Sequence, residues 1–349
     1  MSCELETREQ KITGCLLGCA VGDALGLPRE CLPPERARKL FGKRPLRHRL
    51  FFGRGMMSDD GEHACMTAES LLTAHGDADR FARSLGWRLR WWLLGLPAGA
   101  GSATMRGSVK LWLGWPPSRS GVFSAGNGPA MRASIIGAYA ADDTDLLAQL
   151  VRASTIITHT DPRAEQGALA VALAARQGVL HGSVTDPEAF LASLMPQISD
   201  PELQRNLDAI VPHLHGSAEV YTAALGLRYG VSGYINHTVP VALFCWLRYP
   251  ADFRQAVEEA ILLGGDADTT GAIVGGLMGA ALGAKAIPEE WLHGLAEWPR
   301  SVGWMRRLGA RLAEDGDPPP LCWPGILPRN LLFFVVVLWH VLRRKLPPY

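Results

Sequence analysis

The stretch Gly264-Gly-Asp-Ala-Asp-Thr-Thr-Gly-Ala-Ile-Val-Gly-Gly-Leu-Met-Gly-Ala-Ala-Leu-Gly-Ala284 carries two aspartates and then no charge until Lys285. It predicts a buried helix that begins near Thr269, with an Asp at the capping position, and stops at Lys285 ahead of Pro288. A glycine in a helix interior costs about 1 kcal/mol relative to Ala. Four glycines nevertheless recur at every fourth position and share one helix face: Gly271, Gly275, Gly279 and Gly283. This ridge indicates that another backbone comes very close.

A second glycine ridge lies near the N-terminus. Residues 9–27 form a predicted helix with the same four-residue repeat: Gly14, Gly18, Gly22 and Gly26. Two such ridges predict that the helices pack closely, against each other or against a shared neighbour. Small residues at this spacing are also common in membrane helix pairs. Asp23, the short length and the acidic flanks disfavour that alternative.

Acidic residues cluster at two predicted helix starts. Ser58-Asp59-Asp60 precedes a helical pattern, and Asp59 with Glu62 has the spacing of a capping box. Asp266, Asp268, Thr269 and Thr270 open the second helix. One Asp is enough for a cap, so the additional acids require another explanation.

The chemistry of these side chains points to cations. All the potential ligands are carboxylate or hydroxyl oxygens, which favour Mg²⁺, or Mn²⁺, over zinc. Four carboxylates in one place would repel one another, and two divalent ions would neutralise them. The residues alone therefore predict a binuclear Mg²⁺ hydrolase, for which phosphate esters, nucleotides and sugars are all suitable substrates.

Two weaker signals lie in the middle of the chain. Gly126-Asn127-Gly128 precedes Pro129, which suits the first position of a helix. A helix N-terminus there would be an anion site, although ordinary turn chemistry explains the glycines about as well. His159 precedes the predicted helix start at Asp161-Pro162. A single His at such a place is more often structural than catalytic.

Composition narrows the class of protein. The chain has 349 residues, 48% of them apolar and 20% charged, and a net charge of +1. These values are typical of a globular protein with a large core and disfavour nucleic-acid binding as the main activity. Seven scattered cysteines without a CxxC pair indicate reduced thiols, and the N-terminus has charges of both signs rather than a signal-peptide pattern. We expect a cytoplasmic protein.

Short helices separated by Gly/Pro turns dominate the chain, and strand-like alternation is nearly absent. We predict one all-α domain over 1–325 and a C-terminal tail helix over 326–349. Aromatic residues of the predicted helices 81–97 and 103–115 are expected in the core. The apolar run 331–342 is shorter than the roughly 20 residues that span a bilayer. It favours a docking helix over a membrane-surface anchor, so no membrane partner is expected.

Five motifs together resemble those of the ADP-ribosylglycohydrolase family, which includes the dinitrogenase-reductase-activating glycohydrolase and the ADP-ribosyl-acceptor hydrolases. They occur in the expected order over about residues 10–300: the segments 14–30, 57–63, 126–132, 158–161 and 264–271. The first and last are specific in combination, and the middle three are weaker individually.

This resemblance implies an orthogonal multi-helix bundle with two Mg²⁺ ions in a cleft, from which ADP-ribose is released as product. ADP-ribosylated proteins or small molecules would be the partners, and nucleic acid only as a modified acceptor. Matched residue by residue, Glu30 corresponds to an acid that orients or gates the ribose, and one of Glu30, Asp59 and Asp60 would be the base. Gly126, Asn127 and Gly128 would hold the diphosphate, and His159 would line the ADP-ribose site. The implied metal ligands are Ser58, Asp59, Asp60, Asp266, Asp268 and Thr269.

One position departs from the family pattern. Gly61 stands where the family usually has Thr, which removes a hydroxyl near the expected metal site. Both Asp pairs are present, so we expect an active enzyme. The alternatives are a module that binds ADP-ribose without cleaving it and a binuclear metal phosphohydrolase acting on nucleotides. The acceptor linkage is expected to depend on the loops 31–57 and 96–125, which contain no recognisable motif.

Overall fold

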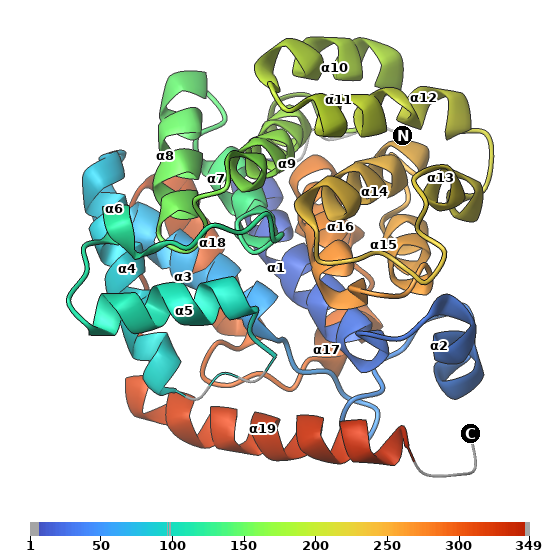
Figure 1. Cartoon of the computed structure of the whole chain (residues 1–349). Helices are drawn as coiled ribbons and strands as arrows, with labels where there is room; N and C mark the ends of the chain where they lie inside the picture. Colours follow the sequence, from blue (N-terminus) through green and yellow to red (C-terminus); the bar gives the residue numbers. More distant parts are fainter. Residues whose placement is uncertain (1–6, 96, 98, 346–349) are drawn as a thin grey trace.

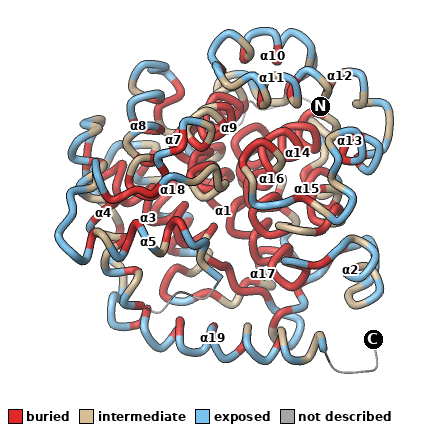
Figure 2. The backbone as a smooth tube through the Cα atoms, viewed as in Figure 1, coloured by how far each residue is buried: buried red, intermediate tan, exposed pale blue. Residues whose placement is uncertain are grey.

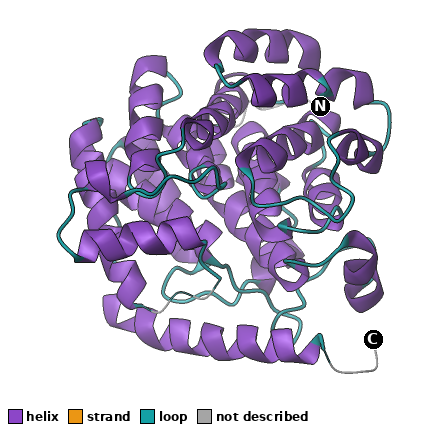
Figure 3. Ribbon diagram, viewed as in Figure 1, coloured by secondary structure: helices purple, strands orange, loops and turns teal. Residues whose placement is uncertain are grey.

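The computed structural model describes residues 7–95, 97 and 99–345, and within these ranges the chain is all helical (Figures 1 and 3). Extended pairing in this part of the chain is limited to isolated bridges, such as Leu32 with Gly265. The all-α prediction is therefore confirmed. The proposed division at residue 325 stays a prediction, and its outermost residues, 1–6 and 346–349, lie outside the described ranges.

Two antiparallel helices form the centre of the fold: α1 (Arg8–Gly26) and α16 (Ala267–Leu282). Their glycine ridges face each other directly. A Cβ atom on Gly18 would lie 2.0 Å from the carbonyl oxygen of Gly275, and one on Gly275 would lie 2.1 Å from that of Gly18. Gly14 with Gly279 and Gly22 with Gly271 repeat the contact. The predicted close packing is confirmed, because the two backbones touch along almost their whole length.

The boundaries of α16 differ from the prediction. The helix begins at Ala267, so Asp266 rather than Asp268 occupies the cap position. It ends at Leu282 because Gly283 adopts a left-handed conformation with φ of 77°. Gly283 therefore terminates the helix, which is a common role for glycine. The functional ridge consists of the first three glycines of the repeat.

Other helices surround this pair and bury it (Figure 2). Six of them make the most extensive contacts with α1 or α16: α3 (Asp59–Ala74), α7 (Ala133–Tyr139), α9 (Pro162–His181), α14 (Ile235–Arg248), α15 (Phe253–Leu262) and α18 (Val302–Glu314). The larger peripheral helices are α2 (Pro34–Phe41), α4 (Ala78–Leu94), α5 (Ser102–Trp112), α8 (Thr144–Ile156), α10 (Pro187–Leu194), α11 (Pro201–Asp208) and α13 (Ala218–Ala224). Short turns complete the periphery as α6 (Pro117–Ser120), α12 (Ile210–His213) and α17 (Glu289–Gly294).

The C-terminal helix α19 (Ile326–Arg343) runs along one edge of the molecule (Figure 1). The apolar run 331–342 is part of this longer helix. The segment Trp323–Arg343 is long and apolar enough to cross a membrane by length and composition alone, and 39% of its most apolar window is buried.

The expectation that the tryptophans of the predicted helices 81–97 and 103–115 belong to the core is largely wrong. Trp92 is buried, whereas Trp87, Trp91, Trp112 and Trp115 are exposed. Trp91 contacts both Trp87 and Trp112 edge to face on the surface of α4 and α5. Helical spacing of aromatic residues thus predicted the helices correctly but not the side that they bury.

Candidate active site

The first part of the site is the start of α3. Ser58 is the N-cap residue, and its hydroxyl donates a hydrogen bond to Asp60 Oδ2 over 3.2 Å. Asp59 and Asp60 occupy the first helical turn, where the helix dipole favours negative charge. The predicted capping box is wrong, because Glu62 turns away from the cap. It accepts hydrogen bonds from the Trp92 indole at 2.7 Å and the Arg300 guanidinium at 3.3 Å.

Asp23 holds this helix start from behind. Its carboxylate, fully buried in α1, accepts hydrogen bonds from the backbone amides of Ser58, at 2.8 Å, and Gly61, also at 2.8 Å. Burial raises the pKa of Asp23 to about 7 despite these bonds. Asp23 was not among the predicted site residues. The available signal was that Asp23 is the single charge between Lys11 and Arg29.

Gly61 lies behind the cleft. A Cβ at this position would lie 2.7 Å from Met57 Sδ and 3.1 Å from Asp23 Oδ2. The side chain of Met57 therefore fills the space that a larger residue at position 61 would need. Gly61, where the family usually has Thr, therefore leaves room for the side chain of Met57 beside Asp23.

The second part of the site is the start of α16. Two consecutive glycines with positive φ, Gly264 at 68° and Gly265 at 75°, turn the chain sharply before Asp266. Gly265 pairs with both Leu32 and Val231, which ties the turn to two neighbouring loops. Asp266 makes no side-chain cap hydrogen bond with its own helix. It accepts a hydrogen bond from Asn127 Nδ2 at 2.6 Å instead.

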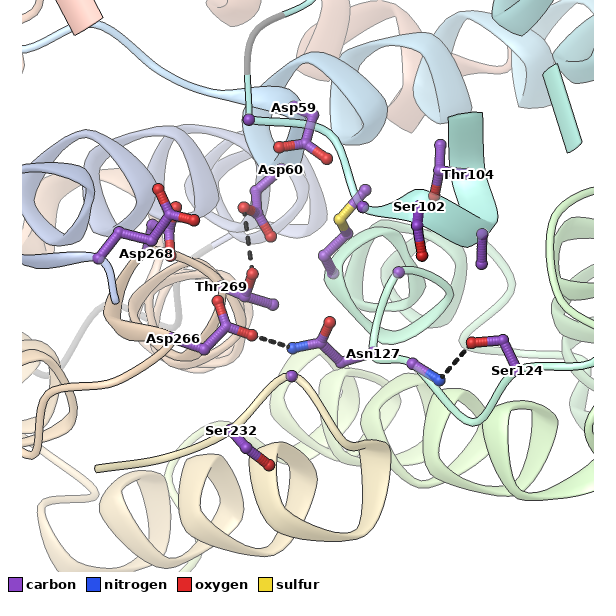
Figure 4. A pocket seen from close by; sticks show the side chains of 18 of the residues that line it. Asp59, Asp60, Ser102, Thr104, Ser124, Asn127, Ser232, Asp266, Asp268 and Thr269 are labelled. Atoms are coloured by element: carbon purple, nitrogen blue, oxygen red, sulfur yellow. Dashed lines mark hydrogen bonds between the residues drawn. The ribbon is translucent and has the colours of Figure 1, made fainter. Parts of the chain in front are cut away.

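The two helix starts face each other across one cleft of about 490 Å³ (Figure 4). The hydroxyl of Thr269 donates a hydrogen bond to Asp60 Oδ2 at 3.3 Å and links α16 to α3. Glu30 lies at the cleft wall immediately after the short turn Leu27–Arg29. Ser58 is buried behind Asp60 and does not line the cleft. All the other predicted site residues line it: Glu30, Asp59, Asp60, Gly126, Asn127, Gly128, His159, Asp266, Asp268 and Thr269.

The cleft concentrates negative charge in a poorly solvated place. Burial, together with the charges of Asp23 and Glu30, raises the pKa of Asp59 to about 8. Burial and neighbouring carboxylates also raise the pKa values of Asp60 and Asp268 well above their usual range. For Glu30, burial and the charge of Asp266 raise the pKa. These raised pKa values show that the ionised carboxylates repel one another and that added positive charge would stabilise them.

The donor set suits a hard cation. Asp60 Oδ1 and Asp268 Oδ1 are buried and lack a hydrogen-bond partner among the described residues. Such orphaned carboxylate oxygens are costly in a folded protein and indicate a ligand or an ion. No group of three or more His, Cys, Asp or Glu side chains in the described ranges converges as a ready metal cage. The residues therefore fit Mg²⁺ or Mn²⁺ in chemical type, with hydroxyl and carboxylate oxygens supplied from two helix starts.

The glycine loop and His159 form the opposite wall. A Cβ on Gly128 would lie 2.9 Å from His159 Cε1, so glycine lets the loop pack on the imidazole ring. Burial and the nearby Arg132 guanidinium lower the pKa of His159 to about 3, so the ring is neutral. The predicted anion site is only partly formed. Pro129 is a cap residue rather than the first helical one, and the next two amides donate to the carbonyl of Asn127, at 2.8 and 3.2 Å.

Several residues that were not predicted as site residues also line the cleft. Ser102 and Thr104 belong to the start of α5, and Ser232 with Gly233 lies in the loop before α14. The loop 96–125 was expected to shape acceptor choice, and residues 99, 101–104 and 124 line the cleft. From the other loop, 31–57, Cys31 is the lining residue. Single serines and threonines in loops carry no spacing signal, so the sequence alone could not have indicated them.

Comparison with known proteins agrees with this fold and site. Residues 4–320 match the model of the family described as ADP-ribosylglycohydrolase. An uncharacterized protein of Archaeoglobus fulgidus is 33% identical over 88% of this chain and 97% of its own length. The ADP-ribosyl-[dinitrogen reductase] glycohydrolase of Rhodospirillum rubrum is 27% identical, with 81% of this chain and 89% of that protein covered.

Solved structures give the same assignment. A chain described as an ADP-ribosylglycohydrolase-related protein complex superposes with a TM-score of 0.68 at 30% identity, covering 89% of this chain and 99% of the other. The chain belongs to the ADP-ribosylglycohydrolase family.

Proposed function

We propose that this protein is a Mg²⁺-dependent hydrolase that cleaves the N- or O-glycosidic bond of ADP-ribosylated substrates and releases ADP-ribose. The observation that carries the proposal is the meeting of two acidic helix starts in one cleft, where the Thr269 hydroxyl reaches Asp60 at 3.3 Å. Membership of the family supports the substrate class. An ADP-ribosylated protein or small molecule is the proposed partner, and nucleic acid only where it is the modified acceptor.

Two Mg²⁺ ions are the proposed cofactors, and Mn²⁺ also fits. The ligands would come from Ser58, Asp59, Asp60, Asp266, Asp268 and Thr269. When bound, the ions would neutralise these acids and withdraw electron density from the oxygens that they contact. Asn127 would orient Asp266 through its 2.6 Å hydrogen bond, so that the loop and the metal site are coupled.

Side chains of this protein would then transfer the protons. In the hydrolysis, a water oxygen forms a bond to the anomeric carbon while the bond to the acceptor breaks, with its electron pair going to the acceptor atom. A base removes the proton from that water, and the acceptor receives one. Glu30, Asp59 and Asp60 are the three proposed bases. Mg²⁺ bound beside these carboxylates would favour their ionised form, which is the form that a general base requires.

Substrate binding would use the opposite wall. Gly126 and Gly128 leave the loop backbone open to the cleft, where the diphosphate of ADP-ribose would lie against it. His159 is neutral, so its ring would pack or hydrogen bond rather than neutralise phosphate charge. The cytoplasm is the proposed compartment, because the six cysteines within the described ranges are free thiols.

The test is an assay of ADP-ribose release from a panel of defined ADP-ribosylated arginine, serine and nucleic-acid substrates, with Mg²⁺ and with EDTA. We expect release from at least one substrate, loss of release in EDTA, and a loss of at least about 100-fold in Asp59→Asn or Glu30→Gln if that residue is the base. Asp145→Asn removes a charge from an exposed position of α8 and should leave the rate unchanged.

Three outcomes would contradict the proposal. Undiminished release of ADP-ribose in EDTA would show that the reaction does not need a metal ion. Tight calorimetric binding of ADP-ribose without cleavage of any linkage would indicate a binding module instead. Release of inorganic phosphate from nucleotides, without release of ADP-ribose, would indicate a phosphohydrolase.

A further inference from the structure

The outer face of α19 is apolar along most of the helix. Eight residues at helical spacing are between 48% and 64% exposed: Leu327, Leu331, Leu332, Phe334, Val335, Leu338, Trp339 and Leu342. These exposed positions recur along the whole of α19, which runs along the edge of the molecule (Figure 2). Single exposed apolar residues are normal, whereas a contiguous face of this kind marks an interaction site. We call these eight residues the α19 face.

The inner side of the same helix is fixed to the protein by buried polar groups. Arg329 forms an ion pair with Glu297 at 2.6 Å, contacts Glu62 at 3.3 Å and donates a hydrogen bond to the Met57 carbonyl at 2.6 Å. Near the other end, His340 donates a hydrogen bond to the Pro28 carbonyl at 3.0 Å. Withdrawing α19 would leave the buried Glu297 without its guanidinium and would remove one of the two guanidinium groups, those of Arg329 and Arg300, that contact Glu62, which is strongly unfavourable. The helix is therefore held parallel to the protein surface, although its composition would permit it to cross a bilayer.

Aromatic residues extend the α19 face on both sides. Phe52, at the tip of the turn Phe51–Arg54, is 92% exposed, and Phe51 beside it packs against the buried cluster that contains Phe333. At the other end, a groove between α4 and α19 is lined by the exposed Trp87, Trp91 and Trp323 together with Leu327. Tryptophan is typical of the boundary between water and hydrocarbon, where its ring is half apolar and half polar.

The charge around this surface is positive. Residues 36–54 contain eight Lys and Arg residues and no acid, and 326–349 contain no acid either, although the whole chain has a net charge of only +1. Arg36 of α2 donates a hydrogen bond to the carbonyl of Arg344, which brings the basic segment beside the C-terminal end of α19. An apolar helix face flanked by basic residues matches an anionic lipid surface, with the side chains in the acyl region and the charges at the headgroups.

We propose that the α19 face docks this protein, lying flat, on the surface of an anionic lipid bilayer. The proposal revises the expectation that no membrane is involved, and it does not depend on the activity proposed above. The acidic cleft has no lining residue from α19, so docking would leave it open to substrate. The helix lies beyond the family match, which ends at residue 320, so this surface is an addition to the family domain.

The test is flotation of the full chain with vesicles of phosphatidylcholine alone and of phosphatidylcholine with phosphatidylglycerol. We expect flotation with the anionic vesicles that weakens at high salt, and at least a tenfold lower bound fraction for Val335→Glu with Trp339→Glu. The matched control is Val220→Glu on α13, an exposed apolar position outside this surface, which should float like the unmodified protein. Circular dichroism melting of all three proteins would show that the variants are folded.

Three results would overturn the proposal. The first is no flotation of the unmodified protein with either vesicle. The second is a dimer in light scattering that the Val335→Glu, Trp339→Glu variant dissociates, without vesicle binding, because the α19 face would then bind a second copy. The third is vesicle binding that resists alkaline carbonate, because the helix would then cross the bilayer. If a variant proves unfolded, the salt and lipid dependence of the unmodified protein still decides the question.

Discussion

α16 and α19 are both long and apolar, but they are attached to the molecule in opposite ways. α16 is buried on all sides, and its glycines bring its backbone against that of α1. α19 is buried on one side only, where Arg329 donates a hydrogen bond to the Met57 carbonyl just before α3 and His340 donates one to the Pro28 carbonyl shortly before Glu30. An apolar helix can therefore be either part of the buried centre of a fold or a surface helix that a few buried polar contacts attach. We call the contacts of Arg329 and His340 the clamp. The residues that approach its neighbour decide between the two.

The largest expected effect comes from filling the glycine contact. Gly275→Leu places side-chain atoms where even a Cβ lies 2.1 Å from the Gly18 carbonyl oxygen. The two central helices would have to separate, so we expect a loss of more than about 3 kcal/mol and little soluble folded protein. Unfolding in denaturant measures this loss of stability. The control is Gly303→Ala in α18, where a Cβ meets nothing closer than 4.0 Å and stability should be retained. Normal stability of Gly275→Leu would show that the helices can move apart freely.

The next largest effect comes from removing the clamp's charge. Arg329→Met leaves the buried Glu297 without its guanidinium, and breaking a buried ion pair costs about 3–5 kcal/mol. The double variant Arg329→Met, Glu297→Gln should recover part of this loss, because the unpaired charge is then gone. Free energies of unfolding for both variants provide the measurement. Equal stability of Arg329→Met and the unmodified protein would mean that packing alone attaches α19.

A matched pair of truncations compares the two helices directly. Val274 in α16 is fully buried and Val335 in α19 is 61% exposed. Val274→Ala should lose about 2 kcal/mol through lost burial and a residual cavity, whereas Val335→Ala should change stability by less than about 0.5 kcal/mol. Thermal unfolding of the two variants in detergent-free buffer measures the difference. Similar losses would show that the α19 face is covered in solution.

The smallest expected effect is a pH dependence of the clamp. Burial lowers the pKa of His340, so its neutral form is favoured in the folded protein. A group with a lowered pKa stabilises the fold above its unfolded pKa, about 6.5, and this stability is lost as the pH falls below that value. We therefore expect the protein to lose more stability between pH 7 and pH 5 than His340→Gln, which cannot titrate. His48 and His63, also with lowered pKa values, remain in both proteins and cancel in the comparison. A steeper loss in His340→Gln would contradict this assignment.

The central helix pair and the aspartates of the cleft could be predicted from the sequence because those signals are local. Glycines at every fourth residue can be recognised within one helix, and acids at a helix start can be recognised within one turn. The clamp and the Asp23 cap could not be predicted in the same way. Arg329 meets Glu62 from 267 positions away, and this tertiary ion pair overrides the capping box that the local spacing of Glu62 suggested. Exposure of Trp87 and Trp91 was missed for a related reason, since helical spacing does not say which face a neighbour covers.

The contacts between the cleft residues could not be predicted from sequence spacing either. Asn127 was expected to face a diphosphate, and the structure shows its amide donating to Asp266 at 2.6 Å. That contact joins two loops far apart in the sequence, and it depends on the turn at Gly264 and Gly265. Motif order alone could suggest that these segments share a site, but it could not say which atoms meet.

The central claim is that the acids of α3 and α16 form one divalent-cation site, and cation binding without substrate tests it most directly. Mn²⁺ titration followed by electron paramagnetic resonance counts the bound ions independently of activity. We predict two Mn²⁺ ions per chain for the unmodified protein, displaceable by Mg²⁺, and weaker binding of at least one ion in Asp60→Asn and in Asp268→Asn. Binding of no Mn²⁺ by the folded protein, or undiminished binding of both ions in both variants, would contradict the account.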